Sequence, residues 1–372
     1  MHICHVIYRF DVGGMENGIV NLINHMPEDS VQHSIIALTY KTDFSKRIKR
    51  NNVKIYELNK RTGNDFNAFY RLYKLLRLIK PDIVHSRNHP STEVPFIAKL
   101  ARVNACIHGE HGRDVHDLDG SNKKYRLLKK LINPFVNHYI CVSQDLENWL
   151  TKQIGIPAQK ISQIYNGVDS IKFSPAHNSP ALRALSGFGD DDIIIGAVGR
   201  MEEVKGHIYL VKGYVKLLQE HPDFKGKIKL VILGDGTCKK ECLDILSDAG
   251  HEENACLPGS VENVQELLPA IDIFVLPSLA EGISNTILEA MSCGLPVIAT
   301  AVGGNTELLI DGHTGKLIPA KDIDAMAHAL YMYVSNPDLR KTQGENSRKQ
   351  IEKQYSMAAM VRQYLDVYER FN

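Results

Sequence analysis

Apolar and polar positions form a repeating pattern along the chain, in which short continuous apolar runs alternate with amphipathic stretches. Such apolar runs are typical of parallel strands buried on both faces. In the first half the pattern predicts strands at Ile3–Tyr8, His33–Thr39, Asp82–His85 and Tyr139–Ser143, and helices at about Met15–Met26 and Asn67–Ile79. In the second half it predicts strands at Ile193–Val198, Lys229–Leu233, Ala255–Gly259, Ile271–Leu276 and Pro296–Ala301, and helices at about His207–Gln219 and Asn285–Cys293. This alternation indicates an α/β protein with two parallel, doubly wound halves.

The length supports the same division, because 372 residues can hold two domains that each have a core. The segment 171–192 is rich in Pro, Ser, Gly and Asp, which favours a linker. We therefore expect an N-terminal domain at 1–170, a C-terminal domain at 193–354 and an amphipathic last helix within 355–372.

Charge is distributed unevenly between the two halves. The whole chain has a net charge of +1, which implies no attraction to nucleic acid. Residues 1–170 hold 24 Lys and Arg against 16 Asp and Glu, a net charge of +8, whereas the remainder has a net charge of −7. The asymmetry suggests that the N-terminal half meets an anionic partner, such as a membrane surface or a phosphorylated acceptor.

The cysteines and the longest apolar runs indicate the compartment. The seven cysteines are odd in number and include no C-x-x-C pair, so buried thiols in a reducing cytosol explain them better than disulfides or a zinc site. No signal peptide is evident, and no apolar run approaches the roughly 20 residues that span a bilayer. The protein is expected to be soluble or peripheral.

The strongest candidate site follows the strand predicted at Ile271–Leu276. Two carboxylates, Glu281 and Glu289, frame the loop and the start of the next helix. The amides expected to face the same cavity belong to Gly282, Ile283, Ser284, Asn285 and Thr286. Free N–H groups and the helix dipole attract phosphate, and carboxylates accept hydrogen bonds from hydroxyls, so the loop suits a nucleotide sugar. Two solvated surface acids are the simpler alternative.

A second loop, after the strand at Ile193–Val198, contains Arg200 and Lys205. A guanidinium and an ammonium beside a helix N-terminus can grip a diphosphate, although either alone is more often a surface charge. In the first half, Gly13 and Gly14 allow a ligand to approach the backbone closely. His85, Arg87 and Asn88 are predicted to lie just past a strand end, where they either contact an acceptor or serve no such role.

The stretch from Pro277 to Val297 resembles, without a gap, the E-x7-E signature of the retaining, metal-independent family 4 glycosyltransferases. It reads P-S-x-x-E-G and then E-A-M-x-C-G-x-P-V. The resemblance implies the GT-B fold, in which two Rossmann-like domains face each other across a cleft and the last helix packs back on the N-terminal domain.

Other stretches match the same family. Gly13-Gly14-Met15-Glu16 resembles a G-G-x-E loop that reaches the donor phosphate or the acceptor. The G-R-x-x-x-x-K-G sequence around Arg200 and Lys205 resembles the donor-phosphate motif. The N-G-V-D turn at Asn166 implies the interdomain cleft, and the backbone near Pro258 implies a contact with the base.

His111-Gly112-Arg113-Asp114 best fits the His-Gly-x-Asp stretch that places a histidine beside the transferred sugar, and His108-Gly109 is the alternative. The histidines at 108, 111 and 116, with the D-x-D at 117–119, also raise a metal site. That reading is disfavoured because their spacing is not helical and because a metal-binding D-x-D belongs to the other transferase architecture, GT-A.

The family mechanism implies a role for each candidate. Arg200 and Lys205 would neutralise the departing diphosphate, Glu281 would orient the sugar, Glu289 would bind the ribose, and His111 would hold the sugar or the acceptor proton. The implied donor is a nucleotide-diphospho-sugar, most simply a UDP-sugar, with no cofactor and no metal. The implied acceptor is a glycan or polyprenyl-linked sugar of surface polysaccharide synthesis, as in the similar exopolysaccharide transferases.

Two other functions stay open. A nucleotide-sugar epimerase would share the GT-B fold and need no acceptor, and a non-catalytic subunit would only bind the nucleotide sugar. The location is expected to be cytoplasmic, with a peripheral contact at the inner face of the cytoplasmic membrane. The basic, amphipathic helix at 122–137 would either lie on anionic lipid or pack its apolar side on the sheet.

Overall fold

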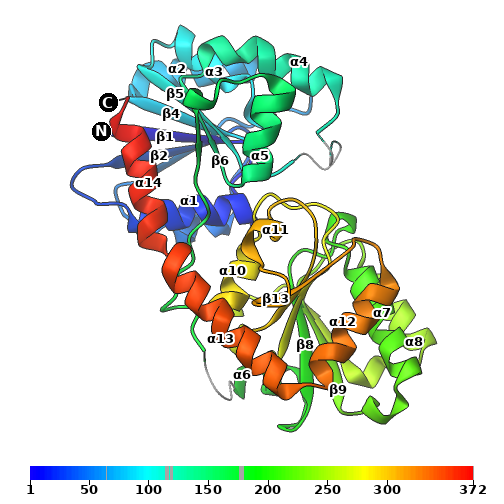
Figure 1. Ribbon diagram of the computed structural model, residues 1–372. Helices are drawn as coiled ribbons and strands as arrows, with labels where there is room; N and C mark the ends of the chain where they lie inside the picture. The colour runs from blue at the N-terminus through cyan, green and yellow to red at the C-terminus, as the bar shows by residue number, and fades with distance from the viewer. Residues whose placement is uncertain (64, 114–116, 118–119, 176–179, 372) are drawn as a thin grey trace. The chain divides into compact units, whose positions relative to one another are not determined.

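The structure is a computed structural model that describes residues 1–63, 65–113, 117, 120–175 and 180–371. The chain forms two units, Met1–Gly167 together with Met357–Asn372, and Val168–Ser356 (Figure 1). The first unit therefore takes its last helix from a distant part of the chain, whereas the second is one continuous segment.

The first unit contains a parallel sheet with the strand order β3-β2-β1-β4-β5-β6-β7. Its strands are β1 (His2–Ile7), β2 (Gln32–Ala37), β3 (Lys54–Glu57), β4 (Ile83–Arg87), β5 (Ala105–Glu110), β6 (His138–Cys141) and β7 (Ile161–Gln163). Its helices are α1 (Gly14–His25), α2 (Phe66–Ile79), α3 (Val94–Leu100), α4 (Lys123–Ile132), α5 (Gln144–Trp149) and α14 (Met357–Glu369). The strand order reverses between β1 and β4, and ligands of open α/β sheets bind beyond the carboxyl ends of such a strand pair.

Both faces of this sheet are covered. The face under α1 and α14 buries Ile3, Leu22, Ile83, Ile107, Tyr364 and Tyr368. The face under α2 and α3 buries Cys4, Leu72, Val84, Val94 and Cys106. Because successive strand residues point to opposite faces, a sheet buried on both faces needs continuous apolar runs, as the sequence has.

The second unit contains a parallel sheet with the order β10-β9-β8-β11-β12-β13. Its strands are β8 (Ile193–Val198), β9 (Ile228–Leu233), β10 (Ala255–Gly259), β11 (Ile273–Leu276), β12 (Val297–Thr300) and β13 (Gly315–Ile318). Its helices are α6 (Pro180–Ser186), α7 (His207–Glu220), α8 (Lys239–Asp248), α9 (Val264–Leu267), α10 (Asn285–Ser292), α11 (Asn305–Leu308), α12 (Ile323–Val334) and α13 (Pro337–Gln354). Figure 1 shows α7 and α12 on one side of the sheet and α10 and α13 on the other. The predicted fold, two doubly wound parallel sheets, is confirmed.

Parts of the segment 171–192 pack within the second unit. The segment belongs to the second unit and contains α6, whose Leu182 is fully buried. Arg348 of α13 donates from Nη1 to the carbonyl of Phe173 at 3.2 Å and to that of Ser292 at 2.7 Å. A hydrogen bond from Arg348 therefore holds the backbone at Phe173, near the start of this segment.

Strand β4 differs from its prediction. It was expected to end at His85 but continues through Arg87, so both side chains lie inside the sheet, 0% and 1% exposed, and not beyond its end. A charged side chain is rarely fully buried unless it is paired, so a buried strand is usually expected to end before an arginine. Here the Arg87 guanidinium is accommodated because Nη1 lies 3.0 Å from His5 Nδ1 and Nη2 lies 3.3 Å from His85 Nδ1.

These contacts belong to a buried histidine cluster, His5, His33 and His85, around Arg87. Arg87 only donates, so the Nδ1 atoms of His5 and His85 accept, and Tyr368 of α14 donates its hydroxyl to His85 Nδ1 at 2.7 Å. His5 then carries its proton on Nε2 and donates to His33 Nδ1 at 3.1 Å. These hydrogen bonds form only while the imidazoles stay neutral, because a protonated imidazole has no acceptor nitrogen.

Two further expectations from the sequence concern the cysteines and the membrane. All seven cysteines are free, and five of them are buried. Within the described parts of the chain, no helix is long and apolar enough to cross a membrane.

The neutral histidines predict that the first unit loses stability in mild acid. Burial, followed by the charge of Arg50, lowers the pKa of His33 from 6.5 to about 3, and burial and Arg87 also lower the pKa values of His5 and His85. The unfolded chain therefore binds protons first as the pH falls below 6.5, and stability declines until about pH 3. His33 alone contributes a loss of about 2 kcal/mol at pH 5.

Urea unfolding followed by fluorescence measures this loss, because the single tryptophan, Trp149, lies in the first unit. The unfolding midpoint should fall between pH 7 and pH 5, and His33→Gln should make that fall smaller. Equal midpoints at the two pH values would contradict the neutral cluster.

Candidate active site

Glu281 is held in place in the loop that follows β11. Its Oε1 accepts hydrogen bonds from Lys205 Nζ at 2.6 Å and from Ser278 Oγ at 2.6 Å. The Ser278 carbonyl in turn accepts from Thr300 Oγ1 at the end of β12, at 2.5 Å. The Glu281 and Lys205 side chains are 9% and 24% exposed, respectively, so the ion pair is largely shielded from water. The structure thus brings together two residues that the sequence placed in separate loops.

Three glycines allow the neighbouring loops to touch this loop through backbone atoms. A Cβ on Gly206 would lie 2.2 Å from the carbonyl oxygen of Pro277, and one on Gly303 would lie 1.9 Å from that of Glu281. A Cβ on Gly304 would lie 2.1 Å from the carbonyl oxygen of Gly282. Side chains never fit at such distances, so only glycine permits this packing. The loop of Glu281 is wedged between the loops that follow β8 and β12.

Helix α10 begins directly after this loop. Ser284 is its N-cap, and the Ser284 Oγ accepts from the Ile287 amide at 3.3 Å. The first turn of the helix, which includes Asn285 and Thr286, carries the positive end of the helix dipole. Glu289 is half-buried and lies four residues after Asn285, on the same helix face. An anion and a group of hydroxyls could both be bound at this end of α10.

Arg200 and Pro258 lie on the surface of the second unit. Arg200 follows β8 and is exposed, and its guanidinium has no ion-pair partner among the residues that the structure describes. Pro258 is exposed on the edge strand β10, where the pairing with β9 shifts register between Cys256 and Gly259. Proline lacks an N–H donor and is accommodated at such an edge irregularity.

In the first unit, the glycine turn after β1 contains Gly13, Gly14 and Glu16. Gly13 is the N-cap of α1, and a Cβ on it would meet Glu16 Oε2 at 2.1 Å, so the Glu16 carboxylate folds back over the turn. Burial lowers the pKa of Arg87, while Tyr368, Tyr364 and, more weakly, Glu16 raise it. Glu16 and Arg87 therefore interact electrostatically, and they follow or end strands β1 and β4, respectively, which pair in the sheet.

His111 directly follows β5. Its backbone N–H donates to Asn88 Oδ1 at 2.7 Å, and its ring lies over Gly109, where a Cβ would meet His111 Nε2 at 2.8 Å and His85 Nε2 at 3.0 Å. Burial, followed by the charge of Arg87, lowers the pKa of His111 to about 3. The imidazole is neutral at pH 7 and suits a hydrogen-bonding role better than that of a general base.

The remaining candidates of the first unit have different environments. His108, the alternative to His111, is 2% exposed and bonds Ser86 Oγ through Nδ1 at 2.7 Å, so it belongs to the interior. Asp117 Oδ1 accepts from the Asn122 amide at 2.9 Å, just before α4. Asn166 is half-buried after β7.

Position 114 of the His-Gly-x-Asp stretch and positions 116 and 119 of the metal-site alternative lie outside the described residues. Among the residues that are described, no group of three or more His, Cys, Asp or Glu side chains could hold a metal ion.

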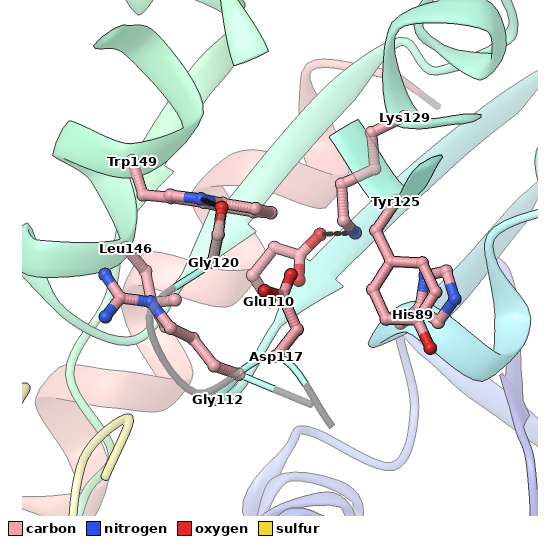
Figure 2. A pocket seen from close by; sticks show the side chains of 10 residues that line it. His89, Glu110, Gly112, Asp117, Gly120, Tyr125, Lys129, Leu146 and Trp149 are labelled. Carbon is pink, nitrogen blue, oxygen red and sulfur yellow. Dashed lines mark hydrogen bonds and ion pairs between the residues drawn. The ribbon is translucent and has the colours of Figure 1, made fainter. Parts of the chain in front are cut away.

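Beside His111 lies a small pocket of about 20 Å³, which is room for about one water molecule. Figure 2 shows Glu110 pointing toward the Lys129 ammonium on one wall, with Trp149 across from them and the His89 and Tyr125 rings side by side. The Lys129 charge and hydrogen bonds from His108 and Lys129 outweigh the effect of burial, which would raise the pKa of Glu110, and lower it to about 2. Most of the exposed lining of the pocket is apolar, and Glu110 and Lys129 neutralise each other in its wall.

The same pair corrects the interpretation of the basic helix. Lys129 was counted with the basic residues of 122–137 that could face lipid, but it is 4% exposed and bonded to Glu110. Leu127 and Leu131 of α4 are instead 58% and 62% exposed. The helix turns a lysine inward and two leucines outward.

Comparisons with known proteins complete this description. Residues 12–171 match the family described as Glycosyltransferase Family 4, and residues 178–350 match the one described as Glycosyl transferases group 1. The chain is 30% identical over 311 residues to the UDP-Gal:alpha-D-GlcNAc-diphosphoundecaprenol alpha-1,3-galactosyltransferase of Escherichia coli, covering 82% of this chain and 79% of that protein. The chain belongs to the family 4 glycosyltransferases.

Two further comparisons extend over almost the whole glycosyltransferase. It is 27% identical over 381 residues to the glycosyltransferase MJ1069 of Methanocaldococcus jannaschii, covering 96% of this chain and 95% of that protein. Its structure resembles that of Alr3699/HepE from Anabaena, crystallised with UDP and glucose, with a TM-score of 0.85, 18% identity and coverage of 100% of both chains. The structural likeness shows the fold, which is GT-B.

Several site residues of the glycosyltransferase were not selected from its sequence. Ser278 is part of the P-S-x-x-E-G stretch, and its position three residues before Glu281 could have suggested a hydrogen bond. Glu110, a carboxylate at the end of an apolar run, could have suggested a buried partner. Its partner Lys129 could not be recognised among the neighbouring lysines, because the sequence does not show which way each one points.

The glycine contacts predict that Gly303→Ala disturbs the Glu281 loop. Alanine at φ +48° costs about 1–2 kcal/mol in any surroundings, and here its Cβ also displaces the Glu281 carbonyl. We expect sugar transfer to fall by more than tenfold. Gly312→Ala is the matched control, because Gly312 has φ +74° with nothing within 4 Å of its Cβ position. It should lose similar stability in urea unfolding and keep its activity. Equal activities in the two variants would contradict the proposed packing.

Proposed function

We propose that this glycosyltransferase transfers a sugar from a UDP-sugar to a glycan or polyprenyl-linked acceptor in surface polysaccharide synthesis, with retention of configuration and with no metal cofactor. The observation that carries the proposal is the ion pair of Lys205 and Glu281. In the proposed role its ammonium stabilises a leaving diphosphate, and its carboxylate accepts hydrogen bonds from sugar hydroxyls. The E. coli relative, named for UDP-Gal and a diphosphoundecaprenol acceptor, and HepE, crystallised with UDP and glucose, support the choice of donor and acceptor.

The ion pair would rearrange when the donor binds. Lys205 exchanges the Glu281 carboxylate for a phosphate oxygen, and Glu281 exchanges the ammonium for sugar hydroxyls. Each charged group is thus paired before and after binding, which limits the cost of removing it from water. Exposed Arg200 and the first amides of α10 add to the positive field around the diphosphate. Glu289 binds the ribose hydroxyls.

The transfer step would occur on one face of the sugar. The acceptor oxygen bonds to the anomeric carbon as the bond from that carbon to the diphosphate oxygen breaks, and the leaving phosphate takes the acceptor proton. Lys205 and Arg200 stabilise the negative charge that develops on the diphosphate. Neutral His111 holds a sugar hydroxyl by a hydrogen bond, which agrees with its lowered pKa of about 3.

Substitutions in the ion pair test this function. Lys205→Ala and Glu281→Ala should each lower turnover by at least about 10²–10³-fold, because each removes charge stabilisation from the transition state. Melting curves should show both variants folded. Exposed Lys240→Ala and Glu253→Ala serve as matched controls with wild-type rates. Wild-type turnover in both ion-pair variants would overturn the proposal.

The donor is identified by thermal shift with UDP, GDP, ADP and their sugar conjugates, where UDP compounds should stabilise the wild type but not Glu289→Ala. A ligand at 100 times its Kd adds about 2.7 kcal/mol. Unchanged turnover in EDTA and a product with the donor's anomeric configuration would support the metal-free, retaining reaction. Conversion of the donor without any acceptor would instead indicate an epimerase.

We also propose that the first unit contacts anionic lipid at the inner face of the cytoplasmic membrane. Its α3/α4 surface exposes four large apolar side chains, Phe96, Leu100, Leu127 and Leu131. The rings of Phe96 and Phe135 pack edge to face at 5.2 Å, which joins α3 to the turn after α4. The same two helices and the turn after α3 also carry exposed basic side chains, namely Lys99, Arg102, Lys123, Lys124 and Lys130. Exposed apolar residues together with basic ones favour a negatively charged lipid surface.

Co-sedimentation with vesicles tests this contact. The wild type should bind vesicles that contain phosphatidylglycerol, and the double variant Leu127→Ser/Leu131→Ser should bind several-fold more weakly because it buries less apolar area. Leu243→Ser, an exposed leucine of the second unit, is the control. Binding that is equal for all three proteins would rule out the α3/α4 surface.

A further inference from the structure

Asn88 adopts a backbone conformation that side chains rarely tolerate. Its φ and ψ are 57° and 175°, in a region that is essentially restricted to glycine. Residues are held in such conformations only where the surroundings impose them, and these places concentrate at functional sites. Asn88 joins the end of β4 to the short turn His89–Ser91.

Hydrogen bonds on three sides of Asn88 impose this conformation. Its N–H donates to the carbonyl of Gly109 at 2.8 Å, and its own carbonyl accepts from the Ser91 amide at 3.2 Å. Ser91 Oγ fixes the preceding residue as well, because it accepts from the Arg87 amide at 2.9 Å. The turn is therefore closed on the strand that leads into it.

The third bond connects Asn88 to His111. Asn88 Oδ1 accepts from the His111 amide at 2.7 Å, so one residue of the β4 loop holds both Gly109 and His111 at the end of β5. The His111 ring needs this alignment because it packs over Gly109, where there is no space for a Cβ.

We infer that Asn88 is a positioning residue that fixes His111 for sugar transfer, and that the strained backbone of Asn88 is retained for this contact. The inference rests on the proposed role of His111. It goes further than that role, since it assigns the orientation of His111 to a residue on a neighbouring strand. The expected signature is that stability and activity respond to substitution in opposite directions.

The variant Asn88→Gly separates the effect of the strained backbone from that of the side-chain hydrogen bond to His111. Glycine accepts the backbone conformation without strain but removes Oδ1, so the melting temperature should stay equal or rise by about 2–4 °C. The kcat should fall by about 10–100-fold, with the KM for the donor changed by less than threefold, because His111 is displaced and the second unit is intact. Asn88→Asp keeps an oxygen acceptor and should restore kcat to within about threefold of wild type.

Lys80→Gly is the matched control. Lys80 is an exposed residue of the same unit, with φ 44° at the C-cap of α2. It should gain stability like Asn88→Gly and keep wild-type kcat. A readout without substrate is the ¹H–¹³C resonance of the His111 ring, assigned by its loss in His111→Ala. That resonance should shift in Asn88→Gly and stay unchanged in Lys80→Gly.

The outcomes separate this inference from the proposed function. Loss of turnover in His111→Ala with wild-type kcat and an unshifted His111 resonance in Asn88→Gly overturns the role of Asn88 alone. Wild-type turnover in His111→Ala overturns the roles of both residues. A lower melting temperature together with lost turnover in Asn88→Gly would make Asn88 a structural residue and also overturn the inference.

Discussion

Close contact between loop backbones is the constraint on which the candidate site of the second unit depends. In addition to the contacts around Glu281, a Cβ on Gly234 would lie 1.9 Å from the carbonyl oxygen of Gly199, and one on Gly236 would lie 2.6 Å from that of Met201. The loops after β8, β9, β11 and β12 therefore interlock along one edge of the sheet. Glycine here allows two loop backbones to come into contact, and it does not make these loops flexible. Loops that pack in this way are ordered before the substrate binds, so binding loses little conformational entropy of the backbone.

The fold and the position of the Glu281 loop could be predicted from sequence because their signals are local. Strand and helix periods, the glycine turns and the stretch from Pro277 to Val297 each lie within a few tens of residues. The features that sequence reasoning placed wrongly depend on contacts between distant residues. The buried position of Arg87 requires Tyr368, since that hydroxyl helps to set the tautomer of His85, 283 residues away in the chain. Composition likewise could not show that Arg348 holds the backbone at Phe173.

The structure also changes the interpretation of the charge asymmetry between the two halves. Arg50, Arg87 and Lys129 of the first unit are 7%, 1% and 4% exposed, so part of the excess positive charge of the N-terminal half is used inside the protein. Lys129 neutralises Glu110, whereas Arg87 is surrounded by imidazoles and phenols. The net charge of a segment therefore overstates the potential that a partner meets, and the arrangement of exposed basic and apolar residues on α3 and α4 is the better guide.

The first unit consists of two separate segments of the chain, and this limits when it can fold during synthesis. The second unit is continuous in sequence, so it can fold as soon as it leaves the ribosome. Residues 1–167 emerge earlier but lack α14, whose Met360, Tyr364 and Tyr368 fill the core above β1, β4 and β5. Until those residues are made, the part of this face that α14 covers stays open and exposes apolar surface. A chaperone that shields this face during translation would act on the first unit and have little to do for the second.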